Sequence, residues 1–290
     1  MREPSAISEL DVLDVDALAA HVGTRWLGRR HVHVASCVST NDLAAAEARA
    51  GAAEGLLITA DEQTGGRGRQ GRSWHSPGAT NVHASVLLRP QQPAMEIPPL
   101  TLLVGGALAQ AIGALGFDVR VKWPNDLLLM CADGHRRKVA GILTEAATEG
   151  DRVGHIVVGI GLNVNTAGFP EDLADKATSL HLVGGATLAR AHVLARILAA
   201  LENAYEQFQI AGATAAIQLW ESHADLGRSC RAHVDGRVIT GLMAGVAADG
   251  ALLIDEPGGA RHRVVAGEVL WAADSPATSG THADDAPPRR

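Results

Sequence analysis

Residues 65–74 read Gly65-Gly66-Arg67-Gly68-Arg69-Gln70-Gly71-Arg72-Ser73-Trp74, a stretch that interleaves four glycines with three arginines and ends on an indole. Glycine lets the backbone approach a ligand closely, and guanidinium groups present a planar fork that matches carboxylate and phosphate oxygens. The stretch, here called the arginine loop, predicts an anion held near the main chain. Taken alone, it is equally typical of a solvated flexible turn.

Two common nucleotide-binding patterns come close to this stretch but fail on context. Gly66-x-Gly68-x-x-Gly71 after a predicted strand formally matches the dinucleotide fingerprint. The residues that follow, Arg-Ser-Trp-His-Ser-Pro-Gly, cannot continue a helix, so no helix N-terminus is available for a pyrophosphate. The glycine-lysine-Ser/Thr step of a Walker A loop is also missing. The arginine loop therefore belongs to another class of anion site.

The composition is that of a chain that buries a core. It has 290 residues, of which 47% are hydrophobic. A net charge of −7 argues against nucleic acid as the main partner, because phosphate binding needs Lys and Arg clustered over a broad face. Cys37, Cys131 and Cys230 are far apart and without CxxC spacing, which indicates neither a disulfide framework nor a zinc site. We expect a cytoplasmic protein.

Two segments bear on location. Residues 1–10 carry three charged side chains and lack the apolar core of a signal peptide. Residues 97–117 are uncharged and nearly long enough to span a bilayer, but they contain several glycines and have no aromatic belt or Lys/Arg cluster beside them. We expect a buried helix there and no membrane partner.

Apolar runs and alternating patterns predict an α+β fold with a mixed or antiparallel sheet and flanking helices. Predicted strands are residues 31–35, 55–61, 81–89, 118–122, 127–130, 138–147 and 153–165, the last four as a meander. Predicted helices are residues 17–22, capped by Asp14 or Asp16 and ended by Gly23, then 43–50, 100–115, 187–209 and 213–223. From residue 227 short strands alternate with Asp-Gly and Gly-Gly turns, which predicts a small all-β barrel.

Four polar residues, Ser39-Thr40-Asn41-Asp42, stand between the first predicted strand and the helix 43–50. Such residues cap helices, but capping explains one of them at most. Consecutive small hydrogen-bonding side chains at a strand-to-helix turn also suit a polar ligand. The residues leave both interpretations open.

Five motifs in this order give the chain a specific resemblance. They are Ser39-Thr40-Asn41, GRGRxGRxW at 66–74, KWPND at 122–126, KxAGIL at 138–143 and GxGxNV at 159–164. With these motifs, the chain resembles the biotin protein ligases from about residue 31 to residue 271. Two positions depart from the family pattern: the loop opens on Gly65-Gly66, and Ser73 stands where the family often has a basic residue.

The resemblance implies a fold and a division of the chain. It implies a class II synthetase-like, lipoate-ligase-like catalytic domain over residues 31–225 and a small SH3-like β-barrel over 226–272. Residues 1–30 would be an N-terminal extension with a short helix, as in the non-regulatory class that lacks a DNA-binding domain. Residues 273–290 are predicted to be a disordered tail, because they lack an apolar period.

The resemblance also implies a two-step reaction. The carboxylate of biotin attacks the α-phosphate of ATP to give biotinyl-5′-AMP and pyrophosphate, and a lysine of biotin carboxyl carrier protein then displaces AMP. The expected small molecules are ATP, Mg²⁺ and biotin, and the expected partner is the carrier protein, with no DNA. The protein itself would be a monomer or a weak homodimer.

By similarity, the motifs assign roles to residues. Lys138 and Arg69 would be catalytic, because a carboxylate and a triphosphate repel each other and need cations between them, and Asp126 would orient or deprotonate the incoming lysine. Biotin-binding residues would be Ser39, Thr40, Asn41, Gln63, Gly66, Arg67, Gly68, Arg69, Lys138 and Gly141. ATP-binding residues would be Arg69, Arg72, Trp74, Lys122, Asn125, Lys138 and Asn163. No protein ligand is assigned to Mg²⁺, which would bind with the ATP phosphates.

Two other functions remain for such a chain. A biotin-responsive regulatory protein would keep the pocket without catalysis, but biotin binding alone needs no phosphate-facing cations such as Lys138 and Arg69. A lipoate or octanoate ligase would have a longer apolar groove and no need for Gln63. From the spacing of the arginine loop, we also expect Arg69 and Arg67 to point the same way.

Overall fold

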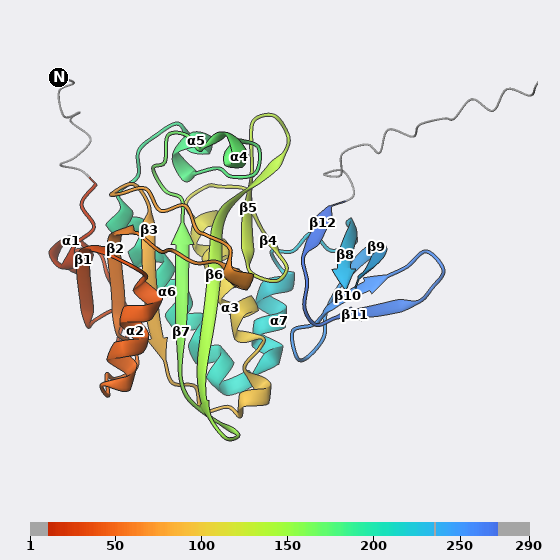
Figure 1. The fold of residues 1–290 in the computed structure, drawn as a ribbon, viewed down its shortest axis with the longest axis horizontal. Helices are drawn as coiled ribbons and strands as arrows, with labels where there is room; N and C mark the ends of the chain where they lie inside the picture. Colours follow the sequence, from red (N-terminus) through yellow and green to blue (C-terminus); the bar gives the residue numbers. More distant parts are fainter. Residues whose placement is uncertain (1–10, 235, 272–290) are drawn as a thin grey trace, which may run out of the picture.

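The computed structural model describes residues 11–234 and 236–271, which form two β-sheets with flanking helices (Figure 1). Residues 1–10 and the predicted tail at 273–290 lie outside the described residues. Sequence and structure agree on the class of fold, a mixed α+β architecture followed by a small antiparallel sheet.

The larger sheet has seven strands in the order β1-β2-β3-β7-β6-β5-β4. β1 and β2 pair in parallel, because α2 connects them as a crossover, and the remaining neighbours pair antiparallel in the described residues. The expected meander is the run from β4 to β7. The strands are β1 (His31–Cys37), β2 (Leu57–Gln63), β3 (Val82–Leu88), β4 (Val119–Lys122), β5 (Asp126–Met130), β6 (Arg136–Glu149) and β7 (Arg152–Leu162).

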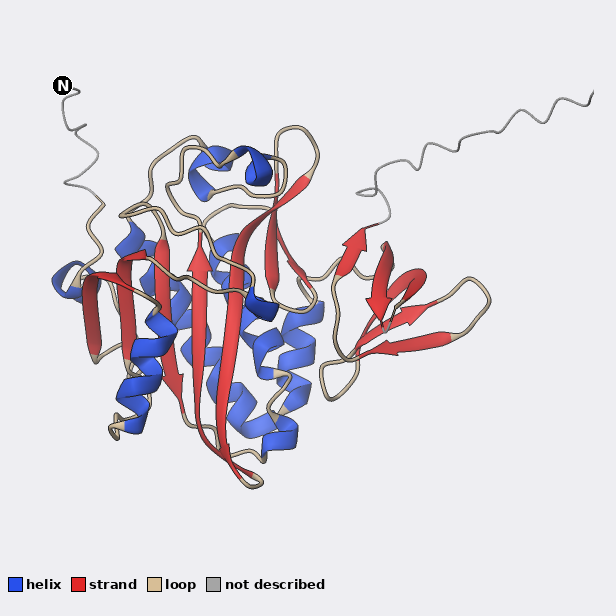
Figure 2. Cartoon of the chain, in the orientation of Figure 1, coloured by secondary structure: helices blue, strands red, loops and turns tan. Residues whose placement is uncertain are grey.

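Helices cover both faces of this sheet (Figure 2). α3 (Leu100–Gly113), α6 (Arg190–Ala211) and α7 (Ala213–Glu221) bury the main core on one face, and α2 (Thr40–Arg49) packs on the other. Residues Ala94–Gly113 are long and apolar enough to cross a membrane, but most of this segment is buried inside the protein as predicted. Gly106 permits this packing, because a Cβ there would lie 2.7 Å from the side chain of Leu219 in α7.

The C-terminal sheet has the antiparallel order β11-β10-β9-β8-β12. Its strands are β8 (Ser229–Val234), β9 (Arg237–Val246), β10 (Leu252–Asp255), β11 (Arg261–Val264) and β12 (Val269–Trp271). Trp123, at the turn between β4 and β5, donates its indole N–H to the carbonyl of Gly250 at 2.9 Å. This bond ties the KWPND turn to the C-terminal sheet.

Several predicted boundaries differ from the structure. Helix α1 spans Val15–Ala19 with Asp14 as its N-cap, so Gly23 does not end it. Helix α2 begins at Thr40 instead of Leu43. Two short helices, α4 (Glu171–Ala174) and α5 (Leu180–Gly184), were not predicted. A helix of one turn is too short to show an apolar period, which explains the omission.

Candidate functional site

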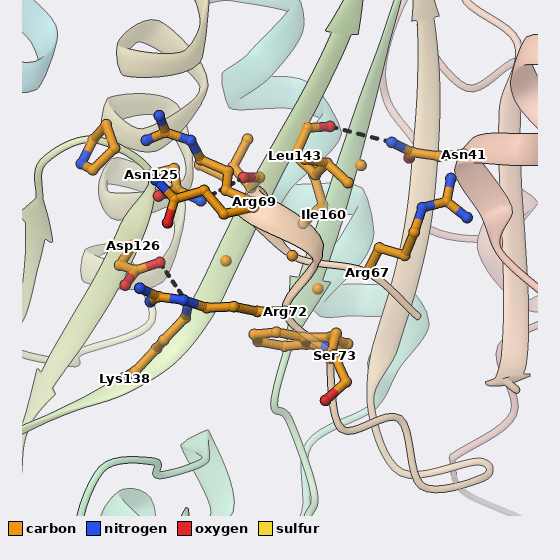
Figure 3. A pocket seen from close by; sticks show the side chains of 18 of the residues that line it. Asn41, Arg67, Arg69, Arg72, Ser73, Asn125, Asp126, Lys138, Leu143 and Ile160 are labelled. Atoms are coloured by element: carbon orange, nitrogen blue, oxygen red, sulfur yellow. Dashed lines mark hydrogen bonds and ion pairs between the residues drawn. The ribbon is translucent and has the colours of Figure 1, made fainter. Parts of the chain in front are cut away.

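A cavity of about 140 Å³ lies beside the arginine loop, over the strands β6 and β7 (Figure 3). The N-terminus of α2, the KWPND turn and residues 267–268 of the C-terminal sheet complete its walls. It brings together most of the predicted site residues, from positions far apart in the chain. Those that line it are Ser39, Thr40, Asn41, Gln63, Arg67, Gly68, Arg69, Arg72, Trp74, Lys122, Asn125, Asp126, Lys138 and Gly141.

Two predicted site residues do not line the cavity. Asn163 is 3% exposed, and its amide donates to the carbonyl of Thr178 at 3.0 Å. Because this side chain is directed into the protein interior, its position does not fit the expected contact with ATP. Gly66 instead closes the arginine loop, since its carbonyl accepts a hydrogen bond from the backbone N–H of Trp74 at 2.9 Å.

The polar residues at the start of α2 are not used as side-chain caps. Ser39 is the N-cap residue, but its hydroxyl makes no capping bond. The backbone N–H of Thr40 donates to Oε1 of Gln63 at 2.9 Å, which fixes the orientation of that amide. The nitrogen of Gln63 is then a donor, 3.5 Å from the hydroxyl of Ser76. The arrangement therefore favours the ligand-holding interpretation over capping.

A chain of polar contacts runs from Thr40 across the sheet. The hydroxyl of Ser85 lies 2.7 Å from the hydroxyl oxygen of Thr40 and 2.6 Å from Oδ1 of Asn41. The amide nitrogen of Asn41 donates to the carboxylate of Glu145 at 2.5 Å and to the carbonyl of Leu143 at 3.3 Å. These contacts join α2, β3 and β6 behind the pocket wall.

The three arginines of the arginine loop diverge. Arg67 makes a two-pronged ion pair with Asp42, at 2.8 and 2.6 Å, and this pairing holds the pKa of Asp42 below its usual value. Arg72 reaches Oε2 of Glu268 at 2.6 Å. Arg69 extends to the other side of the loop from Arg67 (Figure 3), which corrects the expectation that the two point the same way.

The backbone explains this divergence. It is extended at Gly68 and enters a 3₁₀ helix at Arg69, so the alternation that aligns residues i and i+2 in a strand ends between Arg67 and Arg69. Gln70, with a φ of 58°, and Gly71, with a φ of 73°, then turn the chain toward Arg72. In the described residues Arg69 forms no side-chain hydrogen bond or ion pair within bonding distance. Burial lowers its pKa, and the nearby charge of Asp126 opposes that effect. A partly buried cation with no bonded partner is suited to receive an anion.

Trp74 lies against the glycines of the cavity floor. A Cβ on Gly161 would be 2.5 Å from Cε2 of the indole, and a Cβ on Gly141 would be 3.1 Å from Cζ3. The ammonium of Lys138 is 5.4 Å from the ring centroid, within the range of a cation–π contact. The indole N–H of Trp74 is buried and has no hydrogen-bond partner among the described residues. Gly161 of the GxGxNV motif and Gly141 of the KxAGIL motif therefore provide the flat surface against which this ring packs.

The KWPND turn supplies charge at the far side of the cavity. Asp126 accepts from the ammonium of Lys138 at 2.6 Å, with both side chains partly exposed. Asn125 donates to the carbonyl of Ile142 at 2.8 Å and so fixes the turn on β6. Lys122 lines the same wall. The site thus has a polar, hydrogen-bonding end near Thr40 and a cationic end near Lys138 and Arg69.

Sequence reasoning missed several residues of this site. Ser85, Glu145 and Glu268 lie in strands or loops that were read for their apolar pattern alone. Ser85 did carry a signal, because it is a polar residue inside a strand that is buried along its whole length. Glu145 and Glu268 carried none, since partly exposed acidic residues in strands and loops are common.

Comparisons with known proteins agree on one family. Residues 33–163 match the model of the biotin/lipoate A/B protein ligase family, and residues 225–270 match that of the biotin protein ligase C-terminal domain. The bifunctional ligase/repressor BirA of Bacillus spizizenii is 36% identical over 259 residues, which cover 88% of this chain and 76% of the relative. A biotin–[acetyl-CoA-carboxylase] ligase of Mycobacterium tuberculosis is 32% identical, covering 86% and 90%.

Solved structures give the same result. The biotin protein ligase from Aquifex aeolicus, in complex with biotin and ATP, aligns with a TM-score of 0.69 and 27% identity. The alignment covers 83% of this chain and 98% of that one. The motif order, the two matched family models and the shared architecture lead to one conclusion: the chain belongs to the biotin protein ligase family.

Proposed function

We propose that this protein is an ATP-dependent ligase that activates biotin as biotinyl-5′-AMP and transfers it to a lysine of biotin carboxyl carrier protein. One observation carries the proposal. A polar slot at Thr40 and Gln63 is joined, across the glycine floor of β6 and β7, to the cations Lys138 and Arg69. Such a site matches a small molecule with a polar ring at one end and a carboxylate to be adenylated at the other.

The polar end matches a ureido ring, which has one carbonyl acceptor and two N–H donors. Gln63 offers amide N–H groups, because its oxygen already accepts from Thr40. Ser39 has a hydroxyl without a capping bond, and Thr40 has oxygen lone pairs. Lipoate has a dithiolane ring with no hydrogen-bonding groups of this kind, so these donors and acceptors favour biotin over lipoate.

The cationic end matches the first chemical step. A biotin carboxylate oxygen forms a bond to the α-phosphorus of ATP, the bond to the β-phosphate bridging oxygen breaks, and pyrophosphate leaves. Lys138 and Arg69 lower the repulsion between the two anions and stabilise the negative charge that develops. Mg²⁺ would neutralise charge on the ATP phosphates, and we assign it no ligand from this chain.

The second step transfers the biotinyl group. The ε-amine of the carrier lysine bonds to the acyl carbon, the acyl–phosphate bond breaks, and AMP departs. The amine must lose a proton, and Asp126 is a carboxylate at the cavity that can orient it or accept that proton, whereas the other lining carboxylate, Glu268, is paired with Arg72. Because Asp126 pairs with Lys138 at 2.6 Å, this role requires Lys138 to turn toward the phosphate.

The cavity must enlarge when ligands bind. Its volume of about 140 Å³ is smaller than the ~300 Å³ at which small-molecule sites begin, and Trp74 occupies part of the floor. Arg67 and Arg72 are paired with Asp42 and Glu268 at the protein surface. We therefore propose that the arginine loop opens to admit biotin and ATP and closes over the adenylate, with Trp74 beside the adenine.

The test is direct formation of the intermediate. Purified protein is incubated with ATP, Mg²⁺ and either biotin or lipoate, and the products are separated by mass spectrometry. Biotinyl-AMP with biotin and no lipoyl-AMP with lipoate would support the proposal. Binding of biotin without any adenylate would indicate the regulatory alternative, and lipoyl-AMP would indicate a lipoate ligase. Transfer is tested by adding a biotin carboxyl carrier domain.

Three further features stay proposals. We keep the division of the chain at residues 225 and 226, with an SH3-like C-terminal unit. We also keep the cytoplasm as the location and a monomer or weak homodimer as the assembly. Ultracentrifugation at several protein concentrations tests the assembly.

A further inference from the structure

Glu145 ends the chain of hydrogen bonds that begins at Thr40, and it fixes the orientation of the Asn41 amide, which in turn takes the proton of Ser85. The carboxylate accepts the amide N–H of Asn41 at 2.5 Å. An ionised carboxylate can only accept, so this contact fixes which end of the Asn41 amide is the donor. The carbonyl of Leu143, at 3.3 Å from the same nitrogen, requires the same orientation.

The remaining protons follow from this orientation. The oxygen of Asn41 must accept, so the single proton of Ser85 is directed to it across 2.6 Å. Ser85 then has no proton left for Thr40, so the Thr40 hydroxyl donates to Ser85, at 2.7 Å, or to Oε1 of Gln63, at 3.1 Å. In both cases the Thr40 oxygen keeps its lone pairs, and Thr40 lines the cavity.

We infer that Glu145 is a positioning residue which, through Asn41 and Ser85, makes the hydroxyl of Thr40 an acceptor for an N–H group of the bound ring. This inference rests on the proposed function, because the ring is the ureido ring of biotin. Because Asn41 takes the Ser85 proton, Ser85 does not occupy the Thr40 oxygen, and a Thr40 hydroxyl that donates its own proton to Ser85 or Gln63 is a better acceptor than an isolated hydroxyl. Glu145 therefore contributes to selection of the substrate without touching it.

Two features show that this arrangement is built into the site. A Cβ on Gly159 would collide with the amide oxygen of Asn41, so glycine at this position leaves the space that the amide needs. The second carboxylate oxygen of Glu145 lies 3.9 Å from the guanidinium of Arg67. Glu145 thus connects the ring-binding end of the pocket to the arginine loop.

The experiment measures the KM values for biotin and ATP in adenylate formation by the full chain. Glu145→Ala removes the terminal acceptor, and its side chain is 47% exposed, so the sheet should fold normally. Glu62→Ala on β2 is the matched control, because Glu62 is also an exposed strand carboxylate and its side chain makes no hydrogen bond or ion pair in the described residues. We expect about a tenfold increase in the KM for biotin in Glu145→Ala, with the KM for ATP and the melting temperature unchanged.

A second variant and a ligand analogue separate positioning from a general effect. Ser85→Ala interrupts the same chain, so the double variant should have a KM for biotin close to that of either single variant instead of about a hundredfold increase. Two lactam analogues of biotin each replace one ureido N–H by CH₂. The analogue that lacks the N–H facing Thr40 should be discriminated against less strongly by Glu145→Ala than by the wild type.

The outcomes distinguish this inference from the proposed function. If the wild type makes no biotinyl-AMP, the proposed function fails and the inference, which rests on it, is overturned with it. If the wild type is active, three results would each overturn the inference: a KM for biotin in Glu145→Ala within twofold of the wild type, a parallel increase in both KM values, or fully multiplicative effects of Glu145→Ala and Ser85→Ala.

Discussion

Replacing Gly161 by alanine tests whether the glycines of β7 form the seat of Trp74. The added methyl carbon would lie 2.5 Å from Cε2 and 2.7 Å from Nε1 of the indole. Carbon atoms in contact are normally about 3.5–4.0 Å apart, so the ring must move by about 1 Å or leave the sheet. Gly154 lies near the other end of the same strand, and a methyl there meets only the carbonyl of Ala147 at 3.5 Å.

The cost of the Gly161→Ala substitution follows from this difference in contact distance. Insertion of a methyl group into a packed contact costs about 1–3 kcal/mol, which corresponds to a change of about 5- to 150-fold in an equilibrium constant. Because Trp74 is proposed to lie beside the adenine, we expect the KM for ATP to increase by a factor in this range in Gly161→Ala. Gly154→Ala should keep wild-type kinetics, although both variants add one methyl group to β7.

Two assays check this prediction. Steady-state pyrophosphate release gives the KM values for ATP and biotin. Acrylamide quenching of tryptophan fluorescence, compared with a Trp74→Phe variant to isolate the signal of this residue, reports whether the ring has become accessible. If Gly161→Ala has the kinetics and the quenching of Gly154→Ala, the indole is not seated on β7 in solution and our account of the glycine motif is wrong.

Four further predictions follow from the same structure. Lys138→Ala should remain folded, because the Lys138 side chain is one-third exposed. The rate of adenylate formation should fall at least about 100-fold, since a cation between two anions is worth several kcal/mol, and pyrophosphate release at the wild-type rate would contradict this. Arg69→Gly should still form biotinyl-AMP but release it, so an unrelated lysine-rich protein becomes biotinylated; labelling no higher than with the wild type would show that Arg69 does not retain the intermediate. The arginine loop should be cut more slowly by a protease when biotin and ATP are both present, and equal rates with and without them would argue against closure. Burial, reinforced by the charge of Arg190, lowers the pKa of His83 to about 4, so the folded state keeps this ring neutral. The free energy of unfolding should therefore fall by about 3 kcal/mol as the pH decreases from about 6.5 to 4, and urea unfolding of His83→Phe should show a shallower pH dependence than that of the wild type.

Local patterns in the sequence specify the secondary-structure elements and the residue types of the site. The strands, the long helices and the buried segment at residues 94–113 follow from apolar periods that are local to each segment. The arginine loop and the KWPND motif carried the family resemblance, because glycine and arginine have backbone and charge properties that few other residues share. These features need no knowledge of which segments lie side by side.

Which side chains meet depends on how the elements pack in three dimensions. Arg67 and Arg69 are two residues apart, but the backbone changes from extended at Gly68 to 3₁₀ helix at Arg69, so Arg67 pairs with Asp42 and Arg69 lies near Asp126. Asn163 sits in a matching motif, yet its backbone position directs its amide to Thr178. In each case the sequence shows the residue type but not the direction in which the side chain points.

The hydrogen-bond chain from Thr40 to Glu145 shows the physical reason. Its members belong to α2, β3 and β6, which become neighbours through the strand order β3-β7-β6 and through the packing of α2 on that face. Pairing register and helix packing are set by the sum of many long-range contacts, and no local pattern encodes them. The sequence therefore determined the composition of the pocket, and the fold determined which of its polar groups donate, which accept and which remain for a ligand.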